Sequence, residues 1–96
     1  MSAPSPGKRL SRREYAVWRR CQEYGIPYQR VARKPVFDRD RWICQLCQEP
    51  VNPALKFPNP GSASLDHIIP LKRGGLHALS NVQLAHLGCN SKKGAK

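Results

Sequence analysis

The chain has 96 residues, and 17 lysines and arginines against 6 acidic residues give it a formal net charge of +11 and an isoelectric point near 10.2. Such a charge favours a polyanion as partner, most simply nucleic acid, with an anionic membrane surface as the rival. No apolar run approaches the roughly 20 residues of a membrane-spanning helix, and the N-terminus lacks a hydrophobic signal core, so we expect a soluble cytoplasmic protein with no membrane partner.

The N-terminal third is predicted to be basic and helical. Residues 1–10, MSAPSPGKRL, are rich in proline, serine and basic residues and predict a disordered basic arm. A helix is predicted to begin at Ser11, because Ser11 and Glu14 match the S-x-x-E capping box, and to end at Gly25 and Pro27. The apolar residues of this helix form one stripe at helical spacing: Val17, Trp18, Cys21 and Tyr24.

Residues 11–35 as a whole are interpreted as a basic helical extension in front of the main domain, which we expect over residues 36–96. Within the extension, residues 28–34 predict a short basic helical turn before Pro35. The segment VFDRDRWICQLC, residues 36–47, predicts a turn that leads into a short strand and a tight cysteine knuckle.

The rest of the chain alternates loops with short elements. Residues 48–63 hold four prolines without periodicity and predict a loop. Residues 64–69 and 82–86 are apolar and β-branched enough for two short strands, joined by a glycine-containing loop over 71–80. Residues 87–94 predict a short helix.

Four residues form two pairs of potential zinc ligands. Cys44 and Cys47 make a C-x-x-C motif, and His86 and Cys89 make an H-x-x-C motif. Together they supply the four thiolate and imidazole donors of a tetrahedral structural zinc site, which suits a chain too short to rely on its core. The alternative, a redox pair at Cys44 and Cys47, lacks the neighbouring βαβ pattern of thioredoxin-like motifs. Cys21 is expected in the core, since its position belongs to the helical stripe.

Asp66 and His67 lie side by side in the predicted strand 64–69. A carboxylate can bind a hard cation such as Mg²⁺, and a neutral imidazole can accept a proton from water at neutral pH. Asn90 is a candidate second oxygen ligand, and Asn81 a candidate hydrogen-bond partner that orients His67. Taken alone, an Asp-His pair is more often a structural hydrogen-bonded pair.

The segments ICQLC, LDHIIPLKRGG, LSNVQLAHLGCN and KKG together resemble the HNH endonuclease family, whose active site is a ββα-metal motif. The likeness covers residues 36–94, with the zinc pairs, the Asp-His pair and the asparagines in the family's order. It implies an α+β fold, a small zinc-stapled ββα-metal (His-Me finger) domain preceded here by a basic helix.

The resemblance also implies roles for individual residues. His67 would be the general base, Asn81 the residue that positions it, and Asp66 and Asn90 the ligands of a catalytic Mg²⁺ or Mn²⁺ ion. The chain departs from the commonest pattern at two positions. Asn90 stands where the family name has its last histidine, and His86 replaces a zinc-binding cysteine.

The activity implied is metal-dependent hydrolysis of DNA phosphodiesters, with 5′-phosphate and 3′-hydroxyl products. We expect nicking or cutting of double-stranded DNA with low sequence specificity, because no major-groove recognition helix stands out. Basic residues expected to contact DNA are Arg12, Arg13, Arg19, Arg20, Arg30, Arg33, Lys34, Lys72, Arg73, Lys92 and Lys93. For His77, phosphate contact and a solvated loop position are both open.

Two alternatives keep part of this picture. A zinc-stapled DNA-binding module without catalysis would need only the fold and the basic surface, but it leaves the Asp-His pair and the two asparagines unexplained. An RNA-processing nuclease or an RNA-binding protein would keep the chemistry or the charge with a different substrate, although few aromatic residues are available to stack on bases. Small proteins of this family are typical of phages and bacteria, and either a monomer or a homodimer would be compatible with one active site per chain.

Overall fold

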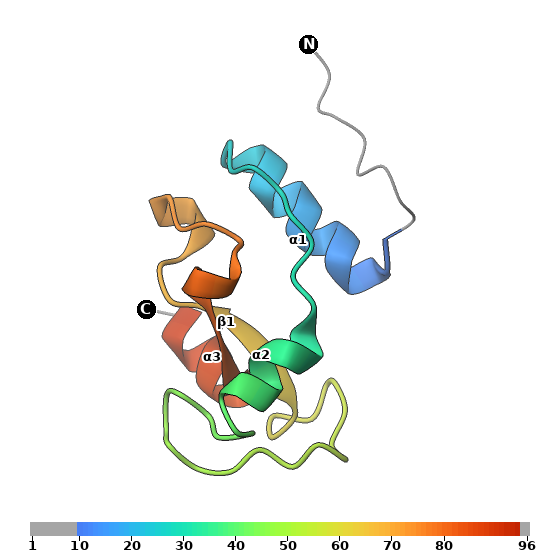
Figure 1. Cartoon of the computed structure of the whole chain (residues 1–96), viewed down its shortest axis with the longest axis vertical. Helices are drawn as coiled ribbons and strands as arrows, with labels where there is room; N and C mark the ends of the chain where they lie inside the picture. Colours follow the sequence, from blue (N-terminus) through green and yellow to red (C-terminus); the bar gives the residue numbers. More distant parts are fainter. Residues whose placement is uncertain (1–9, 95–96) are drawn as a thin grey trace.

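The computed structural model describes residues 10–94, so the arm expected over 1–10 lies outside the described residues except for Leu10. The elements in chain order are α1 (Arg12–Glu23), α2 (Arg33–Arg39), β1 (Ala63–His67), the short 3-10 helices η1 (Leu71–Arg73) and η2 (Leu79–Asn81), β2 (Val82–His86) and α3 (Leu87–Gly94) (Figure 1). This small α+β arrangement of two antiparallel strands and helices is the predicted fold class. None of the described helices is long and apolar enough to cross a membrane.

The start of α1 follows from its capping box. The Ser11 hydroxyl accepts the backbone N–H of Glu14 at 3.1 Å, and the Ser11 backbone N–H donates to the Glu14 carboxylate at 3.0 Å. Two amides that have no partner inside the helix are thereby satisfied. After α1, Gly25 has φ +67°, a conformation that glycine adopts without strain, and the Ile26 N–H returns to the Cys21 carbonyl.

The segment around Pro35 differs from the prediction. Residues 28–34 were expected to form a helical turn that ends before Pro35, but Pro35 lies inside α2. A proline in the first helical turn is tolerated, because its missing N–H would have no partner there. The short strand expected within 36–47 is also wrong: its extended part is only a single bridge between Ile43 and Pro50.

The two strands and α3 form the ββα unit. β1 pairs antiparallel with β2, with Asp66 opposite Gln83 and His67 opposite Val82. β2 and α3 have the predicted bounds, whereas β1 ends at His67, two residues earlier than expected, because the chain there turns toward η1. α3 packs against both strands (Figure 1).

The buried apolar residues form two clusters. The larger one joins α2 to the strands and the cysteine knuckle: Val31, Val36, Phe37, Cys44, Val51, Val82, Leu84 and Ala85. The smaller one contains Cys21, Ile26 and Leu71, and it attaches α1 to the loop that follows β1. Cys21 is fully buried, as predicted. The expected domain boundary between residues 35 and 36 falls inside α2.

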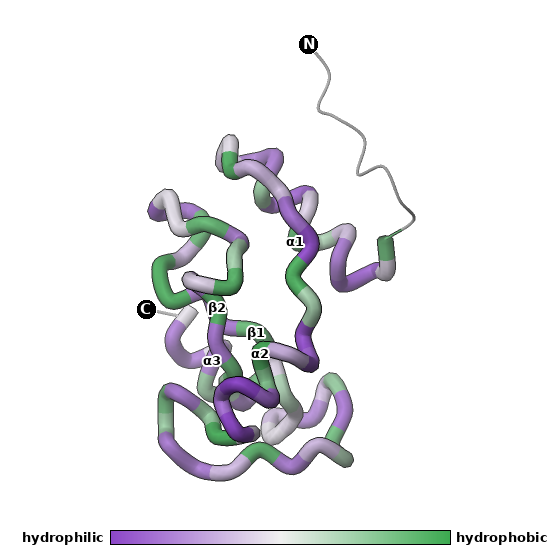
Figure 2. Tube along the Cα trace, in the orientation of Figure 1, coloured by the Kyte–Doolittle hydropathy of each residue, from purple (hydrophilic) through white to green (hydrophobic). Residues whose placement is uncertain are grey.

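Hydropathy differs between α1 and the loop that joins β1 to β2. Figure 2 shows the hydrophilic residues of α1 alternating with apolar ones, whereas the loop between β1 and β2 carries continuous apolar stretches. Within that loop, Leu71 is buried and Ile68 and Ile69 are about half exposed, at 48% and 53%.

Candidate active site and metal centre

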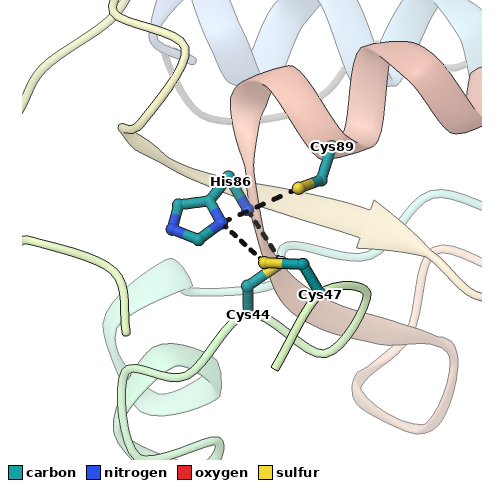
Figure 3. A group of neighbouring side chains, drawn as sticks. All are labelled: Cys44, Cys47, His86 and Cys89. Atoms are coloured by element: carbon teal, nitrogen blue, oxygen red, sulfur yellow. Dashed lines mark hydrogen bonds between the residues drawn. The ribbon is translucent and has the colours of Figure 1, made fainter. Parts of the chain in front are cut away.

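The predicted zinc ligands converge from three elements. Cys44 and Cys47 come from the knuckle after α2, His86 ends β2, and Cys89 lies in the first turn of α3 (Figure 3). One ligand atom of each lies within 4.8 Å of those of all the others. The His86 Nδ1 atom is 3.3 Å from Cys47 Sγ and 3.7 Å from Cys89 Sγ. Three thiols and one imidazole around a common point are a donor set that zinc prefers.

The surroundings of the cluster orient its ligands for a metal. The second ring nitrogen of His86 is 3.0 Å from the Pro50 carbonyl, a contact in which Nε2 carries the proton and Nδ1 keeps its lone pair for a metal. Burial raises the pKa of Cys44, but the backbone N–H groups of Cys47, His86 and Leu46 outweigh it and lower that pKa to about 6. Burial and the neighbouring thiols raise the pKa of Cys89 to about 11. A divalent cation would relieve this crowding by binding all three thiols as thiolates.

Asp66 lies on the opposite side of β1 from His67 and is buried, with 2% of its surface exposed. Both carboxylate oxygens accept hydrogen bonds from the ammonium of Lys93, at 3.0 and 2.8 Å. The Gln83 side-chain amide donates a further hydrogen bond of 2.8 Å to one of them. The Asp66 carboxylate is therefore in direct contact with a positive charge, the ammonium of Lys93.

Asn90 and Lys93 lie three residues apart on α3 and so occupy one face of the helix, the face toward β1. The Asn90 amide nitrogen donates to the Ser64 hydroxyl and to the Leu65 carbonyl, both at 3.1 Å. Asn90 is thus held beside the strand that carries Asp66, and no described residue donates a hydrogen bond to its amide oxygen. Because Cys89 precedes Asn90 directly, the cysteine-histidine cluster ties this face of α3 to the knuckle and to β2.

His67 contacts a second histidine. Its Nε2 atom lies 3.0 Å from Nδ1 of His77, and His77 in turn stacks on Tyr28 with 5.6 Å between ring centroids. His77 is 4% exposed, so it is not the solvated loop residue that the sequence left open. Burial, then the proximity of His77 and Arg20, lowers the pKa of His67 to about 4, which leaves its imidazole neutral at pH 7. Burial lowers the pKa of His77 as well.

Asn81 contacts backbone groups, whereas the sequence predicted a contact with the imidazole of His67. Its amide nitrogen donates to the carbonyls of Ile69 and Leu76, at 3.0 and 2.7 Å, and its amide oxygen accepts the Ile69 N–H at 3.0 Å. Asn81 therefore joins the chain just after His67 to the chain just before His77. It holds the two histidines at their mutual distance indirectly.

The loop closed by Asn81 needs a glycine at residue 75. A Cβ atom built on Gly75 would lie 1.8 Å from the Ile69 carbonyl oxygen and 2.9 Å from the amide nitrogen of Asn81. No side chain fits in that space, so the backbone of residue 75 can approach Ile69 only as glycine. Gly75, the second glycine of the LKRGG segment, thus leaves the space that the Asn81 side chain and the Ile69 carbonyl occupy.

A cleft of about 780 Å³ is lined by residues of both the ββα unit and α1. Asp66, His67, His77 and Asn90 are among the residues that line it. The basic residues that line it are Arg13, Arg20, Arg33, Lys72, Arg73 and Lys93. Of the other basic residues expected to contact DNA, Arg30 pairs with Glu14 and Lys34 with Asp38, while Arg12, Arg19 and Lys92 are exposed outside the cleft lining.

Arg33 lines the cleft and keeps one buried donor without a partner among the described residues. It donates one hydrogen bond of 2.7 Å to the Ala63 carbonyl and lies over the ring of Phe37, but its buried Nε has no hydrogen-bond partner among the described residues. Burial and the nearby Arg13 lower the pKa of Arg33. An anion in the cleft would reduce the repulsion between the two guanidinium groups.

The combination of two strands, a helix and a cysteine-histidine cluster defines a small zinc-type α+β domain with a polar cleft beside it. A family model described as HNH endonuclease matches residues 44–96, more than half of the chain. The chain belongs to the HNH endonuclease family, as its motifs predicted. No curated protein sequence and no solved structure matches it.

Two contributors to the site were not predicted from the sequence. The partnership of His77 with His67 has no sequence signal beyond the presence of a histidine in GGLHALSN, because a loop brings the two together. Lys93 was expected to contact DNA, and nothing in KKG distinguishes the lysine that contacts Asp66 from its exposed neighbour Lys92. Helical spacing from Asn90 was the available signal.

Proposed function

We propose that this protein is a metal-dependent DNA endonuclease that nicks or cuts double-stranded DNA with low sequence specificity. The observation that carries the proposal is that Asp66, His67 and Asn90 line one cleft together with six basic side chains. A carboxylate, an amide and a neutral imidazole beside basic side chains are groups suited to metal-assisted hydrolysis of a phosphodiester.

Asp66 and Asn90 are the proposed ligands of a catalytic Mg²⁺ or Mn²⁺ ion. The donor set fits such an ion, since both supply oxygen atoms and the Asp66 carboxylate already contacts a cation, the ammonium of Lys93, through both oxygens. When bound, a divalent ion would polarise the scissile phosphate and stabilise the charge that grows on the leaving 3′ oxygen. Zinc at Cys44, Cys47, His86 and Cys89 is structural in this proposal, because four protein ligands leave no open position.

His67 is the proposed general base. If its Nε2–H donates to Nδ1 of His77, its own Nδ1 keeps the lone pair that accepts a proton from the attacking water. The neutral form required for this role is favoured by the lowered pKa of His67. His77 is a positioning residue here, stacked on Tyr28 and connected to His67 by one hydrogen bond. Asn81 supports both histidines through the loop backbone.

The basic residues that line the cleft form the proposed DNA-binding surface. Arg13 and Arg20 come from α1, whereas Lys72 and Arg73 come from the loop after β1, so the backbone of one strand would be held between two elements. Arginine and lysine side chains can contact phosphates whatever the base sequence, in keeping with low sequence specificity. The family match covers residues 44–96. In this proposal the helical extension 11–35 serves binding, and residues 36–96 form the nuclease domain.

Cleavage of supercoiled plasmid by zinc-loaded protein tests the proposal. With added Mg²⁺ or Mn²⁺ we expect open-circular or linear DNA bearing 5′-phosphate ends. His67→Ala should lower the rate by about 10²- to 10⁴-fold, the usual contribution of a general base, while DNA binding is retained. The zinc content of the variant serves as the control for folding.

The competing function is a DNA-binding module without catalysis. It predicts tight plasmid binding with no cleavage above the His67→Ala background in either metal. That result would refute the nuclease proposal and leave the contacts of Asp66 and His67 as structural ones.

A further inference from the structure

We propose that Lys93 competes with the divalent cation for Asp66, so that its ammonium must leave the carboxylate before the ion binds. This inference rests on the proposed function, in which Asp66 is a metal ligand. It gives Lys93 a role of its own, which is to lower the affinity of Asp66 for the divalent ion.

The contacts of Lys93 are those of a bound cation rather than of a surface lysine. Its ammonium donates to both oxygens of Asp66, to the His67 carbonyl at 2.9 Å and to the Ile68 carbonyl at 3.4 Å. Four oxygen atoms from three consecutive residues thus surround one positive charge. The Asp66 side chain is 3% exposed, so the ion pair is screened little by water.

The ammonium and a divalent ion cannot share this carboxylate easily. A carboxylate has about four lone-pair positions, and Lys93 uses one on each oxygen while Gln83 uses a further one. Positive charges of +1 and +2 at contact distance of the same group also repel each other strongly at low dielectric. Binding an ion at about 2.1 Å from Asp66 therefore requires the ammonium to move.

Lys93 has somewhere to move. Its side chain is 31% exposed, it lies in the last turn of α3, and it lines the cleft. Rotation of its flexible stem would carry the ammonium from the buried carboxylate toward the space where the phosphates are proposed to lie. In the metal-free protein, Lys93 keeps the buried carboxylate paired, which avoids an uncompensated buried charge.

Mn²⁺ binding to zinc-loaded full-length protein, measured from the electron paramagnetic resonance signal of unbound Mn²⁺, tests the inference without DNA. We expect Lys93→Met to bind Mn²⁺ about tenfold or more tightly than the wild type, since no charge-assisted hydrogen bond has to be displaced. Lys92→Met removes the same charge from the neighbouring exposed residue and should change the affinity much less. Asp66→Asn should lose the site.

The variants separate the two levels of inference. If Asp66→Asn binds Mn²⁺ like the wild type, the ion does not bind at Asp66, and the proposed function loses its metal site. If Asp66→Asn loses binding but Lys93→Met binds no more tightly than Lys92→Met, competition by Lys93 is refuted while the proposed function stands.

A measurement on the wild type covers the case in which the variants do not fold. In protein labelled with ¹⁵N-lysine and ¹³C-aspartate, Mg²⁺ should shift the Asp66 carboxylate resonance and abolish the hydrogen-bonded ammonium signal of Lys93 at the same concentration. A shifted Asp66 resonance with an unchanged Lys93 signal would overturn the competition. An unchanged Asp66 resonance would overturn the metal site itself.

Discussion

Among single residues, the site depends on pairs that are far apart in the sequence. His67 and His77 are ten positions apart, and Asp66 and Lys93 are twenty-seven apart, yet each pair is in hydrogen-bond contact. In both pairs a residue to which the family resemblance gives a role contacts a residue to which it gives none. The orientation of a proposed catalytic group is therefore supplied by neighbours to which the resemblance assigns no role.

Substitution of His77 should affect catalysis through His67 alone. We expect His77→Ala to lower kcat with little change in KM, because the hydrogen bond that selects the Nε2–H tautomer of His67 is removed. His77→Asn, whose amide oxygen can accept the same hydrogen bond, should recover part of the rate. Nitrogen chemical shifts of the His67 ring report the tautomer directly.

A merely structural role for His77 has a different signature. In that case His77→Ala would lower the unfolding temperature and the rate together, and the Asn variant would leave the His67 tautomer unchanged from that of the Ala variant.

Among the helices and strands, the cysteine-histidine cluster connects the parts of the chain that carry the proposed site. It joins the knuckle after α2 to the end of β2 and the start of α3, and α3 presents both Asn90 and Lys93 to β1. The knuckle is also tied to the sheet by the Gln45 N–H, which donates to the Leu84 carbonyl. Asp40, just after α2, accepts the Leu84 N–H through its carboxylate. Leu84 of β2 is thus hydrogen-bonded both to Asp40, before the knuckle, and to Gln45, within it.

Removal of one zinc ligand should therefore disconnect α3 from the strands. We expect Cys47→Ser to lower the zinc content below one ion per chain and to abolish cooperative thermal unfolding, because metal binding supplies folding free energy in domains of this size. Cys47 is exposed, so its substitution does not disturb the core by packing. Zinc stoichiometry and circular dichroism measure the two effects.

Cys21→Ala is the matched control, since Cys21 is a core thiol outside the cluster. It should retain one zinc ion although its packing is weakened. A Cys47→Ser protein with full zinc content and unchanged unfolding would contradict the structural role of the cluster.

In the molecule as a whole, six of the 17 lysines and arginines line one cleft. α1 contributes Arg13 and Arg20 although it lies outside the region matched by the family model. Its attachment through Cys21, Ile26 and Leu71 places this basic helix beside the ββα unit. We therefore include the extension in the proposed binding surface.

The salt dependence of DNA binding should distinguish the two faces of α1. The slope of log affinity against log salt falls by about 0.9 for each phosphate that the protein no longer neutralises. We expect that reduction for Arg20→Ala, which lines the cleft, and a smaller one for Arg12→Ala, which does not. Fluorescence anisotropy with a labelled duplex, in the His67→Ala background and without Mg²⁺, measures the slopes. Equal changes in the two variants would mean that the cleft is not the binding surface.

The convergence of the two cysteine-histidine pairs, the bounds of β2 and α3, the capping box of α1 and the family could all be predicted from the amino-acid sequence. These features depend on local spacing: C-x-x-C and H-x-x-C turns, S-x-x-E at a helix start, and short apolar runs between turn residues. The prediction from local sequence was wrong at Pro35. A proline that was predicted to follow a turn lies in the first turn of α2, where its cost is small and where the helix buries Val36 and Phe37.

The contacts of the motif residues, by contrast, were set by tertiary packing. The partners of His67 and Asp66 come from a loop and from the last turn of a helix, and the distance between the two histidines depends on how the chain closes around Asn81 and Gly75. The assembly of the cleft likewise depends on packing between α1 and Leu71, which lies about 50 residues along the chain from Cys21. Side-chain chemistry can be read from a sequence, but the distances between groups remote in the chain are set by packing, which has no local signature.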